Sequence, residues 1–262
     1  MINTLLIIDP QNDFCDPKGS LYVPGADHDC MRLALMIGRL DNELGSIHVT
    51  MDTHHFFHIA HPAFWVGRDG KHPAPFTLIT PESVSSGEYG ASVAQFKNYA
   101  VEYVHTLDRT GKYNLCIWPP HCLIGSWGHN IYGPLSDVLI KWESNVPGRV
   151  VDYTYKGSNI RTEHYSAIRA EVSDAGDPGS RTNFALIERL KTADNILIAG
   201  EALSHCVANT IRDLLTCLPA DKLIVLTDVS SNVTGFEELG DQFLREVENI
   251  GVRLMKSSEF LS

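Results

Sequence analysis

The amino-acid sequence predicts an α/β fold: a doubly wound, mostly parallel sheet of about six strands with helices on both faces. Short aliphatic runs recur along the chain, and segments with helical periodicity separate them. The runs LLII, ILIA and LIVL are apolar at every position, which a parallel strand between two helical layers requires. The length of 262 residues fits one large domain.

The elements follow in chain order from these runs and their spacing. Seven segments are interpreted as strands, at residues 4–8, 47–51, 115–118, 150–155, 196–199, 223–227 and 252–255. Six segments are interpreted as helices, at residues 30–44, 92–107, 133–142, 183–191, 204–218 and 237–250. The segment at about 67–110 is rich in Pro, Gly and Ser before its helix, so we interpret it as an insertion into a single domain that spans 1–262.

The composition excludes several classes of protein. The 21 Lys and Arg residues stand against 32 Asp and Glu residues, a net charge of -11, so we expect no nucleic-acid partner and no binding to an anionic membrane. No apolar run approaches the ~18 residues that span a bilayer, and no cationic leader precedes the first apolar run. The six cysteines form no C-x-x-C pair, so reduced thiols are expected. These features predict a cytoplasmic protein.

Three reactive side chains follow predicted strands, at the sheet edge where ligands of such folds bind. Asp9 follows the first strand, Lys156 follows 150–155, and Cys206 comes a few residues after 196–199. A carboxylate, an ammonium and a thiol at neighbouring strand ends can act as base, charge stabiliser and nucleophile. The first turn of a helix also favours a thiolate at Cys206. The alternatives are a turn cap for Asp9, a surface role for Lys156 and core packing for Cys206.

A second group of residues has the chemistry of a metal site. Asp52 and His54 are two apart on an extended segment, so both side chains leave from one face, and His121 is a candidate third ligand. One carboxylate and two imidazoles suit Zn²⁺, and also Fe²⁺ or Mn²⁺. The remaining histidines near this segment, His55, His58, His61 and His72, have no assigned position at one ion, and surface histidines are the alternative.

Five motifs in order carry a family resemblance that covers most of the chain: IDPQNDF, DTHHFFHIAH, WPPHC, YKG and GEALSHCV. The chain resembles the nicotinamidase/isochorismatase-like cysteine hydrolases, within them the metal-containing nicotinamidase (pyrazinamidase) branch. The resemblance implies an isochorismatase-like fold. It implies a catalytic triad of Asp9, Lys156 and Cys206. It also implies metal ligation by Asp52, His54 and His121, with His58 at the position of an additional histidine in some members.

The same resemblance implies further features of the site. Phe14 and Trp118 match aromatic positions that enclose the substrate ring. A cis peptide bond precedes the residue that matches Leu203, and the backbone N–H groups matching Leu203 and Cys206 form the oxyanion hole. Relatives often associate, so we expect a homo-oligomer.

Taken with the resemblance, these residues predict a metal-containing cysteine amidohydrolase. The expected reaction converts nicotinamide to nicotinate and ammonia through a thioester on Cys206, as part of NAD metabolism. The nearest alternative is a related cysteine hydrolase that acts on another small amide, carbamoyl or imide compound. A second is a metal-dependent hydrolase that uses activated water, with Cys206 only structural. A third is a catalytically silent binding protein, against which the intact triad argues.

Overall fold

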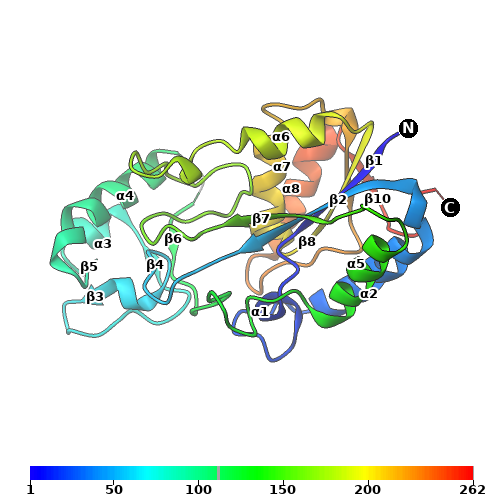
Figure 1. The fold of residues 1–262 in the computed structure, drawn as a ribbon. Coiled ribbons are helices and arrows are strands. Elements are labelled where there is room, and N and C mark those ends of the chain that lie inside the picture. The colour runs from blue at the N-terminus through cyan, green and yellow to red at the C-terminus, as the bar shows by residue number, and fades with distance from the viewer. Residues whose placement is uncertain (111–112, 262) are drawn as a thin grey trace.

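A six-stranded sheet forms the centre of the computed structural model, which describes residues 1–110 and 113–261 (Figure 1). Within these residues every neighbouring pair in the sheet is parallel, and the strand order is β10-β9-β8-β1-β2-β7. The strands are β1 (Asn3–Ile8), β2 (Leu44–Asp52), β7 (Asp152–Lys156), β8 (Asn195–Gly200), β9 (Leu223–Leu226) and β10 (Arg253–Met255). The predicted parallel α/β fold is confirmed.

Burial along the strands explains their composition. Every residue of β1 and of β9 is buried, which fits their aliphatic sequences, because helices cover both faces of the central strands. The edge strand β7, by contrast, places Tyr153 and Tyr155 in solvent and Thr154 and Lys156 in the interior. This alternation turns the Lys156 side chain inward at the end of the strand.

Helices lie on both sides of the sheet (Figure 1). One side carries α2 (Ala26–Leu40) and α5 (Gly133–Ser144), which pack against each other, and the other carries α6 (Phe184–Lys191), α7 (Ala208–Leu214) and α8 (Glu237–Asn249). Single-turn helices are α1 (Asn12–Cys15), η1 (Asp41–Glu43), η2 (Pro62–Phe64), η3 (Ala94–Phe96), η4 (Pro178–Ser180) and η6 (Ala220–Lys222). Each helix within 1–110 and 113–261 is too short or too polar to cross a lipid bilayer.

The strand order reverses between β1 and β8. From β1 the chain adds β2 and β7 on one side, and it then returns to place β8, β9 and β10 on the other. At such a reversal the connections leave in opposite directions and open a crevice beyond the carboxyl ends of the two central strands. The fold therefore places the ends of β1 and β8 at its natural ligand site.

One end of the molecule is built from the segment before β6 (Leu115–Cys116) (Figure 1, cyan to teal). It contains β3 (Trp65–Gly67) paired with β5 (Tyr89–Ala91), together with β4 (Leu78–Ile79), α3 (Pro81–Ser85) and α4 (Lys97–Arg109). The predicted single domain with an insertion at about 67–110 stays a prediction.

One predicted strand was wrong. Residues 115–118 were expected in the central sheet, but only β6 (Leu115–Cys116) is a strand, and it pairs antiparallel with β4. The Trp118 N–H donates instead to the Ala60 carbonyl, at 2.7 Å. The run is apolar because loops bury it, and periodicity does not distinguish that burial from burial in a sheet.

Candidate functional site

The three predicted catalytic side chains meet beyond the reversal point of the sheet. Asp9 follows β1, Lys156 ends β7, and Cys206 lies in η5 (Leu203–Val207), a five-residue π-helical turn between β8 and α7. The Lys156 Nζ lies 2.8 Å from Asp9 Oδ2 and 3.7 Å from Cys206 Sγ. All three side chains are buried, so their mutual attraction is weakly screened by water.

Local contacts fix the carboxylate of Asp9. The hydroxyl of Thr50, on the neighbouring strand β2, donates to Asp9 Oδ1 at 2.6 Å. Asp9 itself has a φ of 46°, in the left-handed region that Asp tolerates better than most residues. The chain therefore turns away from the direction of β1 at Asp9, the residue whose carboxylate belongs to the site.

The charges of the site are set by burial and by ion pairing. Burial raises the pKa of the Cys206 thiol well above its usual range, although the Lys156 ammonium acts in the opposite direction. Burial also raises the pKa of Asp9, and Lys156 again opposes it. Burial would lower the pKa of Lys156, but the carboxylates of Asp52 and Asp9 raise it well above its usual range. The sulfur therefore rests as a thiol, because the effect of burial outweighs the effect of the helix end, which favours the thiolate.

The thiol has a base within reach. The Asp9 carboxylate and the Cys206 sulfur both lie beside Lys156 Nζ, at 2.8 Å and 3.7 Å, and the carboxylate is close enough to serve as an acceptor for the thiol proton. A buried carboxylate with a raised pKa is a stronger base than a free one. The pair is thus arranged for proton transfer from sulfur to oxygen when an electrophile approaches.

A cluster of imidazoles lies beside this triad. Asp52 Oδ2 lies 3.0 Å from His54 Nε2 and 3.3 Å from His121 Nε2. His54, His61 and His121 each offer one ring nitrogen within 4.8 Å of the others, and all three residues are buried. The structure thus brings together the predicted Asp52, His54 and His121, and it adds His61.

The hydrogen bonds of the histidines show which ring nitrogens can bind a metal. In each of the three, Nδ1 faces a backbone carbonyl: Gly157 O for His54, Phe56 O for His61 and Pro119 O for His121. An Nδ1 that donates its proton to a carbonyl leaves Nε2 with a free lone pair. Among the described residues, the buried Nε2 atoms of His54 and His61 have no hydrogen-bond partner. Three such nitrogens and a carboxylate fit a divalent metal ion.

His58 is held differently from the other histidines. Its Nε2 donates to the Thr162 carbonyl at 3.1 Å, and its Nδ1 accepts the N–H of Ala60 at 3.2 Å. Both ring nitrogens are therefore engaged within the protein, and His58 is not placed as a ligand. His55 and His72 are exposed and do not belong to the cluster. The spacing of histidines in one loop could not distinguish these cases, because the carbonyl that occupies His58 Nε2 belongs to Thr162, in a distant segment.

Aromatic side chains line a small pocket above the sulfur. Phe14 and Trp118, both predicted to enclose a substrate ring, line it together with Asp52, His121 and Cys206. Six further residues line the pocket without any sequence signal that marks them: Leu21, Glu163, Tyr165, Ala202, His205 and Val233. The Trp118 Nε1–H donates to the Tyr165 hydroxyl at 2.8 Å, which fixes one wall.

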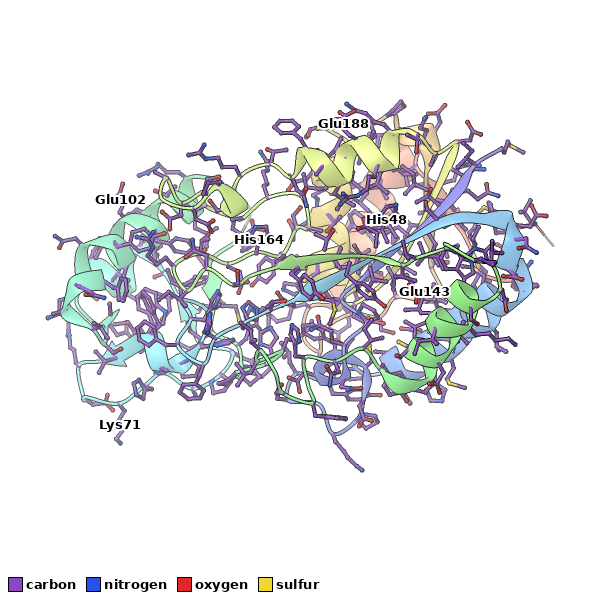
Figure 2. The ribbon with its side chains drawn as sticks, viewed as in Figure 1. His48, Lys71, Glu102, Glu143, His164 and Glu188 are labelled. Atoms are coloured by element: carbon purple, nitrogen blue, oxygen red, sulfur yellow. The ribbon has the colours of Figure 1, made fainter. Side chains whose placement is uncertain are left out.

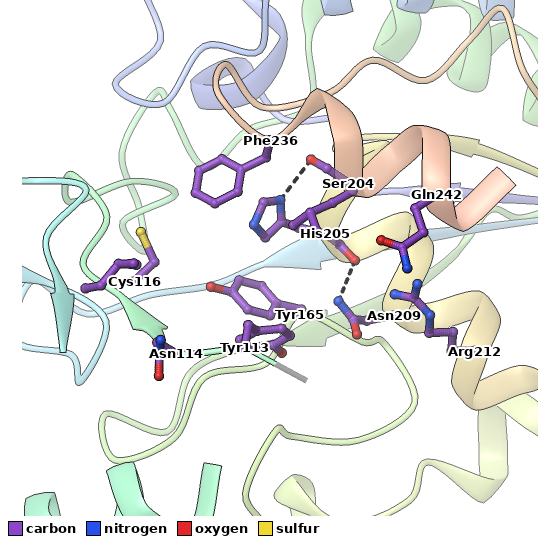
Figure 3. A pocket seen from close by; sticks show the side chains of 12 residues that line it. Tyr113, Asn114, Cys116, Tyr165, Ser204, His205, Asn209, Arg212, Phe236 and Gln242 are labelled. Carbon is purple, nitrogen blue, oxygen red and sulfur yellow. Dashed lines mark hydrogen bonds between the residues drawn. The ribbon is translucent and has the colours of Figure 1, made fainter. Parts of the chain in front are cut away.

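A larger cavity of about 380 Å³ adjoins this pocket (Figure 3). The two share Tyr165 and His205, and Figure 3 shows the His205 ring held by Ser204 between Phe236 and Tyr165. The loop after β7 also contacts the triad: the main-chain carbonyl of His164, which Figure 2 labels, accepts a hydrogen bond from Lys156 Nζ.

The backbone near Cys206 differs from the expected arrangement by one residue. The cis peptide bond joins Glu201 and Ala202, so it does not directly precede Leu203. The Leu203 N–H donates to the Ser231 carbonyl at 2.8 Å, and it is not free to stabilise an oxyanion. Within the described residues the Ala202 N–H has no protein acceptor, and Ala202 lines the pocket beside Cys206. Ala202, rather than Leu203, therefore has an available donor.

Comparisons with known proteins agree with this geometry. No family model matches the chain. The curated nicotinamidase of Saccharomyces cerevisiae is 26% identical over 209 residues, which are 80% of this chain and 79% of that protein. A structure of yeast nicotinamidase bound to the inhibitor nicotinaldehyde covers 97% of this chain and 100% of its own, with a TM-score of 0.68 and 21% identity.

Two further solved structures have the same fold. Pyrazinamidase of Pyrococcus horikoshii, in complex with zinc, covers 98% of this chain and 99% of its own, with a TM-score of 0.58 and 19% identity. An isochorismatase-like hydrolase from Alkaliphilus metalliredigens covers 100% and 98%, with a TM-score of 0.55 and 17% identity. The chain is therefore similar in sequence to a nicotinamidase and has the isochorismatase-like fold that nicotinamidases and pyrazinamidases share, which confirms the resemblance that its motifs predicted.

Proposed function

We propose that the protein is an amidohydrolase that converts nicotinamide to nicotinate and ammonia through a thioester on Cys206. The observation that carries this proposal is the contact of Lys156 Nζ with both Asp9 and Cys206, beside the imidazole cluster and at the floor of an aromatic pocket. The similarity to a curated nicotinamidase supports the choice of substrate.

The residues of the site account for both halves of the reaction. Asp9 takes the thiol proton as the sulfur attacks the amide carbon, and the C–S bond forms. The backbone N–H groups of Ala202 and Cys206 stabilise the developing oxyanion, while Lys156 compensates the negative charges around it. Asp9 then returns the proton to the departing nitrogen, and ammonia leaves. A water molecule, deprotonated by Asp9, attacks the thioester, and nicotinate is released with the thiol restored.

We propose that Asp52, His54, His61 and His121 hold one divalent metal ion. Such an ion supplies a Lewis-acid contact for a ring nitrogen of the substrate. Zinc is the favoured ion, because imidazole and carboxylate ligands suit it and the similar pyrazinamidase structure is in complex with zinc. Fe²⁺ and Mn²⁺ are the alternatives that the ligand set also accepts. The predicted homo-oligomer and the predicted cytoplasmic location remain predictions.

Ammonia release from nicotinamide, measured together with the metal content of the protein, tests this function. We expect Cys206→Ala to abolish turnover, with a loss of at least about 10³-fold in kcat, and to leave the metal content unchanged. Cys217→Ala is the matched control, because Cys217 is exposed and lies outside the pocket. Ammonia release that survives in Cys206→Ala refutes the covalent route. If another small amide, carbamoyl compound or imide is turned over as fast as nicotinamide or faster, that compound is the substrate instead of nicotinamide.

A further inference from the structure

The loop between β8 and Cys206 begins with a buried acidic residue that the proposed reaction does not use. Glu201 is 1% exposed, although it lies directly before the pocket residue Ala202. Its Oε2 accepts the N–H of Ser231 at 3.1 Å. The hydroxyl of the same Ser231 donates to Oδ2 of Asp29, in the first turn of α2. Ser231 therefore joins two buried carboxyl groups from different parts of the fold.

The two carboxyl groups also bind each other, which requires a proton. Both carboxyl groups contact Ser231, and the Glu201 and Asp29 side chains lie within hydrogen-bonding reach of each other; two ionised carboxylates cannot form a hydrogen bond because neither has a donor. Asp29 already accepts from Arg32 and from the Ser231 hydroxyl, which favours its ionised form. No N–H or O–H group of the described residues donates to Glu201 Oε1. The shared proton therefore belongs to Glu201.

The same hydrogen bonds connect Glu201 to the backbone on either side of Ala202, whose N–H must stabilise the oxyanion. Ser231 binds the Glu201 side chain through its N–H, and its carbonyl accepts the N–H of Leu203 at 2.8 Å. The Glu201 N–H donates at 2.8 Å to the carbonyl of Ile8, the last residue of β1, which directly precedes Asp9. Both neighbours of Ala202 are thus fixed, and the Ala202 N–H is held in the pocket with Cys206.

We propose that Glu201, as a neutral carboxylic acid bound to Asp29 and Ser231, is a positioning residue that holds the Ala202 N–H group at the place where the oxyanion develops. This inference rests on the proposed amidase function. The groups that face the Glu201 carboxyl are Asp29 and Cys30 from α2, Cys15 from α1 and Ser231 from the loop after β9, with Arg32 on the far side of Asp29.

Because the Glu201 carboxyl group must keep its proton, the activity should depend on pH. Burial raises the pKa of Glu201 well above its usual range, and the neighbouring Asp29 raises it further. When Glu201 ionises at high pH, its bond to Asp29 is lost and two negative charges face each other in the interior. The loop then loosens, so activity should fall on the alkaline side.

Two substitutions separate the proton from the shape of the side chain. In Glu201→Gln, the carboxamide N–H can donate to Asp29 and its oxygen can accept from Ser231, so kcat at pH 7 should stay within about two-fold of wild type. Its alkaline decline should begin at a higher pH than in wild type. In Glu201→Leu both bonds are lost, and kcat should fall by about 10²-fold with little change in KM, as when an oxyanion donor is removed. Glu188→Gln, at an exposed position of α6, is the control.

Thermal unfolding provides a readout that needs no substrate. The unfolded protein loses the Glu201 proton above its ordinary pKa of 4.5, whereas the folded protein keeps it, so folding takes up a proton at Glu201 and the contribution of this residue to wild-type stability falls as pH rises. The difference in Tm between Glu201→Gln and wild type should therefore shift in favour of Glu201→Gln from pH 5 to pH 8. The difference between Glu188→Gln and wild type should stay constant. A constant difference between Glu201→Gln and wild type refutes the buried proton.

The outcomes keep the two proposals apart. If Glu201→Leu retains wild-type kcat, the positioning role is wrong while the amidase function stands. If wild type releases no ammonia from nicotinamide, the proposed function is wrong, and the positioning role falls with it whatever the unfolding data show for the proton. If Glu201→Leu fails to fold, Ser231→Ala replaces it, because this change removes only the hydroxyl bond to Asp29. A kcat loss of about 3-fold or more with unchanged KM then supports the role, and wild-type kcat refutes it.

Discussion

At the scale of single residues, Lys156 connects the two halves of the site. Its ammonium contacts Asp9 of the triad at 2.8 Å and Asp52 of the imidazole cluster at 3.2 Å. Two buried carboxylates this close would repel each other without a cation between them. One lysine therefore permits both a catalytic base and a metal-ligand carboxylate in the same interior, which explains why it is buried despite its charge.

The first prediction distinguishes His61 from His58 as a metal ligand. His61→Asn should keep a donor for the Phe56 carbonyl and lose Nε2, so metal affinity should fall by more than the roughly 10–100-fold typical of lost outer contacts. His58→Gln should keep the donor for the Thr162 carbonyl and retain the metal. Metal content after dialysis against graded chelator measures both. Full metal in His61→Asn, or loss in His58→Gln, contradicts the assignment.

At the scale of elements, the turn after β7 shapes the metal cluster through its backbone. Gly157 has a φ of +85°, and its carbonyl accepts the His54 Nδ1–H at 3.0 Å. A Cβ at this position would lie 2.7 Å from His54 Cε1 and 2.9 Å from Asp52 Oδ1. The glycine after Lys156 is therefore required both for the turn and for the space that two candidate ligands occupy.

The second prediction uses this close approach. Gly157→Ala should displace His54 and Asp52 and reduce both metal content and kcat, by at least about 10-fold for affinity. Gly148→Ala is the matched control, because Gly148 has the same φ of +85° with open space around it. Both variants carry the backbone strain, about 1–2 kcal/mol. Equal metal content and kcat in the two variants would show that the contact with His54 has no effect.

At the scale of the whole molecule, the interior holds several neutral histidines. Burial lowers the pKa of His205 to about 4, and it lowers the pKa of His61 to about 2. The unfolded chain protonates such rings near pH 6.5, whereas the folded chain resists protonation until lower pH. The unfolded state therefore binds more protons in between, and stability falls as pH is lowered through this window.

The third prediction concerns His205, whose pKa is lowered by burial alone. Between its ordinary value of 6.5 and its folded value of about 4, the loss amounts to about 3 kcal/mol. His205→Phe should remove this loss. The difference in free energy of unfolding between His205→Phe and wild type should therefore shift by about 3 kcal/mol in favour of the variant as pH falls from 7 to 4. Denaturant unfolding at both pH values measures it, with His28→Gln at an exposed position as control. Parallel pH profiles for His205→Phe and wild type would contradict the prediction.

The sequence by itself determined the parallel sheet and the location of the reactive residues. Aliphatic runs such as those of β1 and β9 can only be buried on both faces, and the residues that follow such strands must meet at one edge. Asp9, Lys156 and Cys206 were therefore predictable as neighbours, and the structure places them together.

Only the tertiary structure decided the finer points. His61 joins the metal cluster and His58 does not, because the Thr162 carbonyl from a distant segment occupies Nε2 of His58, whereas the Phe56 carbonyl binds only Nδ1 of His61. Ala202 has the free donor and Leu203 does not, because Ser231 lies more than twenty residues further along the chain yet accepts the Leu203 N–H. Periodicity reports which side of an element is buried. It carries no information on which distant backbone group completes a hydrogen bond. Those hydrogen bonds determine which of several nearby residues keeps a free donor or a free ring nitrogen.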